Sequence, residues 1–109
     1  MSTVEDTNKV DSIGIDKNSG VVILKIFDHL DWINEHDHLL LLQEKINSYL
    51  GFLESKEIYE AYPDSRDRKF QIDIAFLEKP SAKAIRFLDT VSKIVLDAGF
   101  SLTYSIDKL

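Results

Sequence analysis

The chain has 109 residues, of which 44% are apolar and 29% charged, which suits one domain with a single hydrophobic core. It contains no cysteine, so disulfides, thiolate zinc sites and iron–sulfur clusters are excluded. The net charge of −6 disfavours nucleic-acid binding, because affinity for a polyanion comes largely from Lys and Arg, and here only Arg66, Arg68 and Lys69 cluster.

The first residues, MSTVEDTNKVDS, are polar and acidic and have neither hydrophobic periodicity nor the apolar core of a signal peptide. We predict a flexible N-terminal leader over residues 1–9 and a single α+β domain over residues 10–109. The longest apolar runs, VVIL and LLLL, are far too short to cross a bilayer. These features predict a cytoplasmic protein with no membrane partner.

The next segment has the pattern of a β-hairpin. Ile13 and Ile15 alternate with small or polar residues, KNSG is a turn signal, and residues 21–27 are rich in β-branched side chains. Because this second strand is apolar on both faces, we expect it to lie inside the sheet.

Two helices and two further strands follow. Apolar residues at helical spacing predict a helix that begins near Asn34 or Asp37 and stops before Pro63. We assign the polar residues Gln43, Glu44, Lys45 and Asn47 to its outer face. A strand is predicted in KFQIDIAFLEK. A helix capped by Ser81 and ended by Gly99 follows it, and then a last strand in FSLTYSID.

The order ββαβαβ predicts an α+β two-layer sandwich, with a mixed four-stranded sheet and both helices on one face. The other face stays partly open. It mixes polar residues such as Lys25, Gln71 and Asp73 with Val21, Ile23, Phe27 and Leu77. We therefore predict that solvent or a second copy of the chain covers this face, the second case giving a homodimer.

The stretch DHLDWINEHDHLLLL gathers all three histidines, His29, His36 and His38, with Asp28, Asp31 and the only tryptophan, Trp32. Imidazoles and carboxylates are metal ligands, but on a helix His36 and His38 lie about 200° apart and cannot share an ion. The segment also lacks a recognised ligand spacing such as HxxxH. We assign no metal site and expect no cofactor.

Two interpretations of the segment remain open. As a helix entrance, it would use Asn34 or Asp37 as a cap, with Trp32 or Ile33 closing over the first turn. As a recognition surface, it would present an aromatic anchor among polar groups. The candidate partner- or ligand-binding residues are therefore Asp28, His29, Asp31, Trp32, His36 and His38.

Acid–base pairs such as Asp28 with His29, or Asp31 with His38, are a further option. The chain has no GxSxG nucleophile motif and no glycine-rich phosphate loop, so we assign no catalytic residue.

Two long stretches, IGIDKNSGVVILKIFDHLDW and HLLLLQEKINSYLGFLESKEIYEAYPD, resemble a family of small bacterial proteins designated a domain of unknown function, family 6572. The resemblance implies a bacterial, stand-alone, single-domain protein, and it brings no known activity. We interpret the chain as a small cytosolic binding module that acts through an unknown protein partner, in an adaptor or immunity-like role. The alternative is a small metal-binding protein or enzyme that uses the segment from Asp28 to His38.

Overall fold

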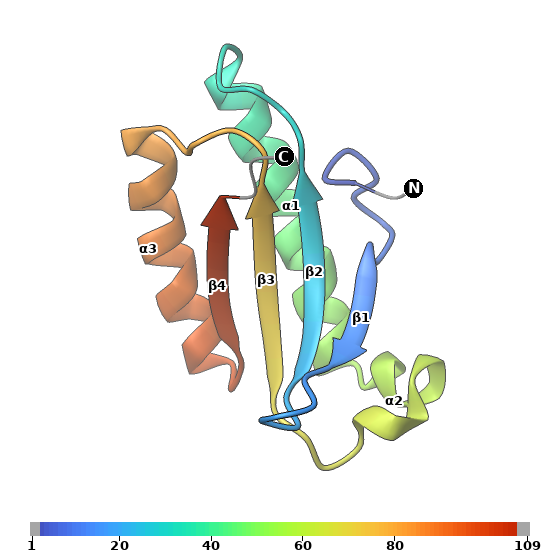
Figure 1. Ribbon diagram of the computed structural model, residues 1–109. Helices are drawn as coiled ribbons and strands as arrows, with labels where there is room; N and C mark the ends of the chain where they lie inside the picture. The colour runs from blue at the N-terminus through green and yellow to red at the C-terminus, as the bar shows by residue number, and fades with distance from the viewer. Residues whose placement is uncertain (1–2, 107–109) are drawn as a thin grey trace.

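A mixed four-stranded sheet in the order β1-β2-β3-β4 organises the computed structural model, which describes residues 3–106 (Figure 1). Strand β1 (Ser12–Ile15) pairs antiparallel with β2 (Val22–Asp28). β2 pairs parallel with β3 (Phe70–Phe76), which pairs parallel with β4 (Ser101–Ile106). Helices α1 (Glu35–Glu54) and α3 (Ala82–Asp97) form the two crossovers, so the predicted α+β class with a mixed four-stranded sheet is confirmed.

The sequence signals for element ends are largely met. The Ser81 hydroxyl caps α3 by accepting a hydrogen bond from the Ala84 N–H at 3.1 Å. Gly99, at a φ of +97°, follows the helix in the left-handed region that glycine tolerates. In the hairpin turn, hydrogen bonds from the Ser19 hydroxyl and the Asn18 N–H lower the pKa of Asp16.

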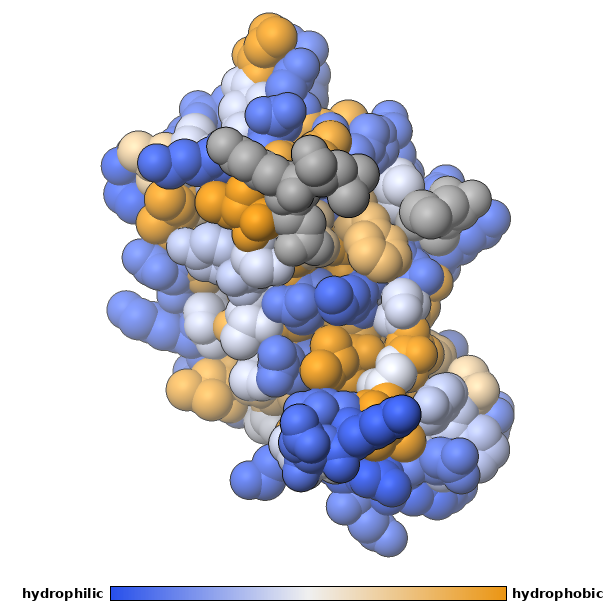
Figure 2. Space-filling view, viewed as in Figure 1, coloured by the Kyte–Doolittle hydropathy of each residue, from blue (hydrophilic) through white to orange (hydrophobic). Residues whose placement is uncertain are grey.

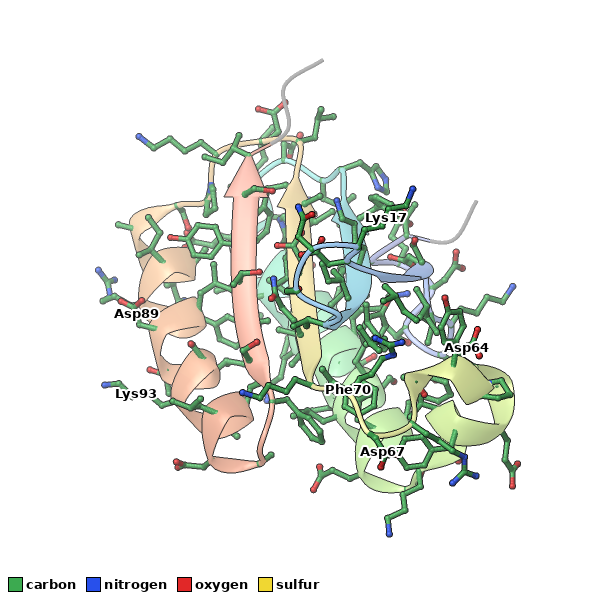
Figure 3. All side chains as sticks on the ribbon, turned by 60° about the horizontal axis from the view of Figure 1, so that its bottom comes forward. Lys17, Asp64, Asp67, Phe70, Asp89 and Lys93 are labelled. Atoms are coloured by element: carbon green, nitrogen blue, oxygen red, sulfur yellow. The ribbon has the colours of Figure 1, made fainter. Side chains whose placement is uncertain are left out.

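The connection between α1 and β3 differs from the prediction. Lys56 adopts a positive φ of 67°, which ends α1, and a short helix α2 (Glu57–Ala61) follows it. A single 3₁₀ turn then runs over Pro63–Ser65, where the sequence predicted only a loop. Figure 3 labels Asp64 and Asp67 in this connection, where the Arg68 guanidinium donates to the backbone carbonyls of Asp64 and Gly20.

One face of the sheet carries the core. Both crossover helices contribute to this core through Leu42 and Ile46 of α1 and Leu88 and Val95 of α3. The apolar strand residues that face this core alternate along β2 and β3 as the pleat requires; they are Val22, Leu24, Ile26, Phe70, Ile72, Ile74 and Phe76. Within residues 3–106, no helix is long and apolar enough to span a membrane.

The opposite face of the sheet, which is turned toward the viewer in Figure 1, is covered by neither crossover helix. Polar and apolar surface alternate on it (Figure 2). At its centre the side chains bond to one another. The Thr103 hydroxyl donates to the Asp73 carboxylate at 2.7 Å and accepts from the Gln71 amide at 2.9 Å. The Lys25 ammonium lies 3.8 Å from the same carboxylate. A homodimer through this face stays a prediction.

The start of the chain packs against the domain. Val4 is fully buried in the core, and its N–H donates to the Phe27 carbonyl at 3.0 Å. These contacts count against a frayed leader over residues 3–9. Residues 1 and 2 of the predicted leader lie outside the described part of the chain.

Candidate functional site

The segment that the sequence singled out lies where β2 ends and α1 begins. Asp28 is the last residue of β2 and lies in register with Phe76, the last residue of β3. Because β2, β3 and β4 are parallel, this is the edge of the sheet where their carboxyl ends meet, and ligands of α/β sheets commonly bind at such an edge. The connecting loop projects from this edge, at the top of Figure 1.

A buried pair, Asp28 and His38, lies at the base of this loop. The His38 Nε2 is 2.6 Å from the Asp28 Oδ2, and the two side chains are 2% and 0% exposed. The His38 Nδ1 is 2.8 Å from the carbonyl oxygen of Asp31, which can only accept, so Nδ1 carries a proton. Nε2 contacts the Asp28 Oδ2, so both ring nitrogens have partners inside the protein.

Backbone bonds and an aromatic stack fix this pair in place. The Asp28 Oδ1 accepts from the Leu30 N–H at 3.2 Å, and the Asp28 carbonyl accepts from the Leu77 N–H at 2.9 Å. Trp32 stacks on the His38 ring with centroids 3.6 Å apart and planes 17° from parallel. The indole therefore closes over the first turn of α1, as the helix-entrance interpretation expected of Trp32 or Ile33.

The other candidate residues of the segment point outward. His29 is half exposed and lies 3.3 Å from Glu5, and His36 is exposed on α1. The Asp31 side chain is exposed and accepts from the Ile33 N–H at 3.1 Å. The structure thus joins Asp28, Trp32 and His38 but leaves the side chains of His29, Asp31 and His36 apart from them.

The predicted cap is wrong in its chemistry, although α1 does begin near Asn34. Asn34 occupies the N-cap position but makes no side-chain cap bond, and its carbonyl accepts from the His38 N–H at 3.0 Å. Glu35 and Asp37 supply the predicted acidic first turn, which suits the positive end of the helix dipole.

Ile33, the alternative to Trp32 for closing over the first helical turn, is instead the most exposed large apolar residue of the described chain. Its side chain is 84% exposed at the tip of the loop, beside the exposed Asp31 and Asn34. Figure 2 shows hydrophobic surface at this projecting tip, with polar surface below it. The sequence feature that could have indicated this exposure is the position of Ile33 between Trp32, which packs inward, and the start of α1.

A shallow pocket of about 200 Å³ lies beside the loop. Its lining residues are Glu5, Leu30, Asp31, Asn34, Asp37, His38 and Leu41. Among residues 3–106, no three His, Asp or Glu side chains are placed to hold a metal ion. The pocket therefore offers an acidic, hydrogen-bonding surface, and the histidine that lines it has no free nitrogen.

A second buried polar cluster was missed, because Lys45 was assigned to the outer face of α1. The side chain of Lys45 is 0% exposed. Its ammonium donates to the Asp6 carbonyl at 2.7 Å, the Lys9 carbonyl at 2.5 Å and the Asp11 carboxylate at 2.7 Å. All three of its protons are thus used, and the N-terminal segment is bound to α1. Helical spacing could have indicated this burial, because Lys45 follows the buried Leu42 by three residues.

Tyr49, one turn further along α1, extends this cluster. Its hydroxyl donates to the Lys25 carbonyl at 2.5 Å and accepts from the Asp11 N–H at 2.8 Å. Burial raises the pKa of Tyr49 well above its ordinary value, and the negative charge of Asp11 adds to the rise. The cluster is therefore structural and joins the N-terminal segment, β2 and α1.

Comparison with known proteins places the chain in a family without an assigned activity. A family described as a family of unknown function (DUF6572) matches residues 1–108. No curated protein and no solved structure matches the chain. The match covers all but the last residue and confirms the resemblance noted in the sequence. The chain belongs to the family of unknown function DUF6572.

Proposed function

We propose that this protein is a small binding module that recognises another protein through the tip of its β2–α1 loop and the start of α1, together the segment 29–37. The observation that carries the proposal is Ile33, which is 84% exposed on a loop whose base is locked by the buried Asp28–His38 pair. Holding an apolar side chain in water costs free energy, and a partner that covers the side chain removes this cost. Such a preformed anchor also binds with little further ordering cost.

The geometry of His38 favours binding over catalysis. A general acid or base must reach its substrate within hydrogen-bond distance. The His38 ring nitrogens already bond to Asp28 and to the Asp31 carbonyl, and the ring face is covered by Trp32. Nothing among the described residues favours the alternative of a metal-binding protein or enzyme.

The charge around the anchor indicates the kind of partner. Asp31, Glu35 and Asp37 lie in the segment 29–37, which has no Lys or Arg. Interfaces commonly place an apolar anchor inside a polar rim, and complementary charge on the rim speeds association. The partner we propose therefore has an apolar pocket surrounded by Lys and Arg. An adaptor or immunity-like protein would act through such a surface.

The proposal is tested by parallel affinity capture from extracts of a cell that carries the gene. The baits are the wild-type chain, Ile33→Asp and Leu40→Asp. Leu40 is the matched control, because it is also an exposed leucine-sized residue, at 47%, but lies on α1 outside the tip. We expect one partner, rich in surface Lys and Arg, to be retained by wild type and Leu40→Asp and reduced about tenfold or more for Ile33→Asp.

The salt dependence of capture distinguishes the contribution of the charged rim from that of the apolar anchor Ile33. Raising the ionic strength screens exposed charges and should weaken the retained complex without unfolding the module. Equal capture by Ile33→Asp and wild type, with both variants folded by circular dichroism, would exclude the loop tip as the binding surface.

A further inference from the structure

A second surface, the free edge of β4, differs sharply from the other edge of the sheet. Proteins commonly protect edge strands with charged residues, proline, bulges or short length. The β1 edge is protected by its short length, because it has only four residues and includes Gly14. Strand β4 has six residues, SLTYSI, with no charge, proline or glycine, and within residues 3–106 it pairs only with β3.

Large apolar side chains remain exposed around this edge. Tyr104 and Ile106 are each 41% exposed, although their register with Ile74 and Phe76 places them on the core face of the sheet. On α3, which packs next to β4, Ile94 and Leu96 are 55% and 67% exposed. These two residues lie about 100° to either side of the buried Val95, so one of them is on the flank toward the free edge.

We propose that β4 pairs antiparallel with β4 of a second copy, so that two sheets join into one across a two-fold axis. The sequence of the strand is self-complementary in the registers that keep both core faces on one side. In one register Thr103 lies opposite Thr103 of the partner subunit and Leu102 lies opposite Tyr104 of the partner subunit. In the other, Tyr104 lies opposite Tyr104 of the partner subunit.

Each of these registers places apolar groups opposite apolar groups on the core face and hydroxyls opposite hydroxyls on the open face. Neither brings two charges together. Cross-strand pairs of these kinds stabilise a sheet, whereas like charges opposite one another destabilise it. The free main-chain groups of the edge would gain partners at the same time. The open face of the sheet suits a second copy less well, because its central polar residues already bond to one another.

The dimer also has a consequence for the loop tips, which rests on the proposed function. Strands β2 and β4 run in the same direction, so antiparallel pairing of the two β4 strands points the two loop tips to opposite ends of the assembly. The dimer would then bridge two partner molecules instead of holding one with both tips.

Cysteine cross-linking tests the pairing, because the natural chain has no cysteine and each introduced thiol can meet only its counterpart in a second copy. The variants are Thr103→Cys and Tyr104→Cys at the expected axis, Lys25→Cys on the open sheet face and Leu40→Cys on α1. Opposed residues of antiparallel strands have Cα atoms about 4.5–5.5 Å apart, which suits a disulfide. Light scattering of the unmodified chain gives the oligomeric state.

We expect a dimer by light scattering and rapid disulfide formation at position 103 or 104, whichever register is adopted. Lys25→Cys and Leu40→Cys should form disulfides at the slower rate of random collision. A monomer at every soluble concentration would overturn the proposal. So would cross-linking at Lys25→Cys without cross-linking at position 103 or 104. Loss of partner capture by Ile33→Asp tests the loop tip alone and leaves this result unaffected.

Discussion

His38 has a different environment from the two other histidines of the same short segment. His29 and His36 are exposed, whereas the ring of His38 is enclosed by Asp28, the Asp31 carbonyl and Trp32. Buried polar groups are tolerated when every donor and acceptor has a partner, and here each ring nitrogen has one. The ring therefore contributes to the rigidity of the loop and is not available to a ligand.

Substitutions of the buried pair should have unequal effects. His38→Leu leaves the Asp28 carboxylate buried without its partner, and we expect a loss of about 3 kcal/mol of unfolding free energy. In Asp28→Asn the amide can donate to Nε2 in place of the carboxylate contact, so the cost should be only about 1 kcal/mol. Urea denaturation followed by circular dichroism measures both, with the exposed His36→Leu as a control that should change little. Equal, small effects at positions 28 and 38 would contradict a paired, buried arrangement.

Tyr49 gives a pH dependence of known sign. Its pKa is raised in the folded protein, so the protonated hydroxyl stabilises the fold fully below the ordinary phenol pKa of about 10. As the pH rises above that value, the unfolded chain ionises first and this stabilisation is lost. Denaturation at pH 8 and pH 11 should therefore show a larger loss of stability for wild type than for Tyr49→Phe. Equal losses would mean that the hydroxyl is not held as described.

At the scale of elements, Lys45 joins parts of the chain that are far apart in sequence. Its ammonium binds the segment 6–11 from the middle of α1, and Asp11 in turn accepts from the Phe27 N–H of β2 at 2.9 Å. The β1–β2 hairpin, α1 and the N-terminal segment are therefore joined through the buried ammonium of Lys45 and its partner, the Asp11 carboxylate.

Replacing Lys45 by methionine should release the N-terminal segment. The variant keeps side-chain volume but leaves the Asp11 Oδ1 and two carbonyls without a donor, so we expect a loss of about 3 kcal/mol. Hydrogen exchange provides the specific signal: the Val4 amide should be protected in wild type and exchange faster in Lys45→Met. Fast exchange of Val4 in both proteins would instead support the flexible leader predicted over residues 1–9.

Local chemistry in the sequence identified most elements but not their long-range polar contacts. Strand alternation, the Ser81 cap and Gly99 depend on neighbours within a few residues, so the pattern predicted them correctly. The break at Lys56 and the burial of Lys45 depend on tertiary packing, and hydrophobicity assigns a lysine to the surface. The candidate segment could be singled out from its composition, but only the fold shows which of its side chains face inward.

At the scale of the whole molecule, two surfaces lie on different parts of one scaffold. The loop tip projects from the edge where the parallel strands end, and the β4 edge runs along the side of the same sheet (Figure 1). In the proposed dimer the two tips face opposite ways, so each would bind its own partner. Linking two sites in this way raises effective affinity only for partners that are themselves arrayed or paired.

Whether His38 is structural decides whether the loop tip or a reactive histidine is the functional feature of this segment. Nuclear magnetic resonance of the histidine side-chain nitrogens measures this directly in the folded protein. We predict that His38 shows a slowly exchanging proton on Nδ1, protected by its bond to the Asp31 carbonyl, while His29 and His36 show no such signal. A His38 ring that exchanges as fast as those of His29 and His36, with Nδ1 unprotonated, would contradict the buried pair.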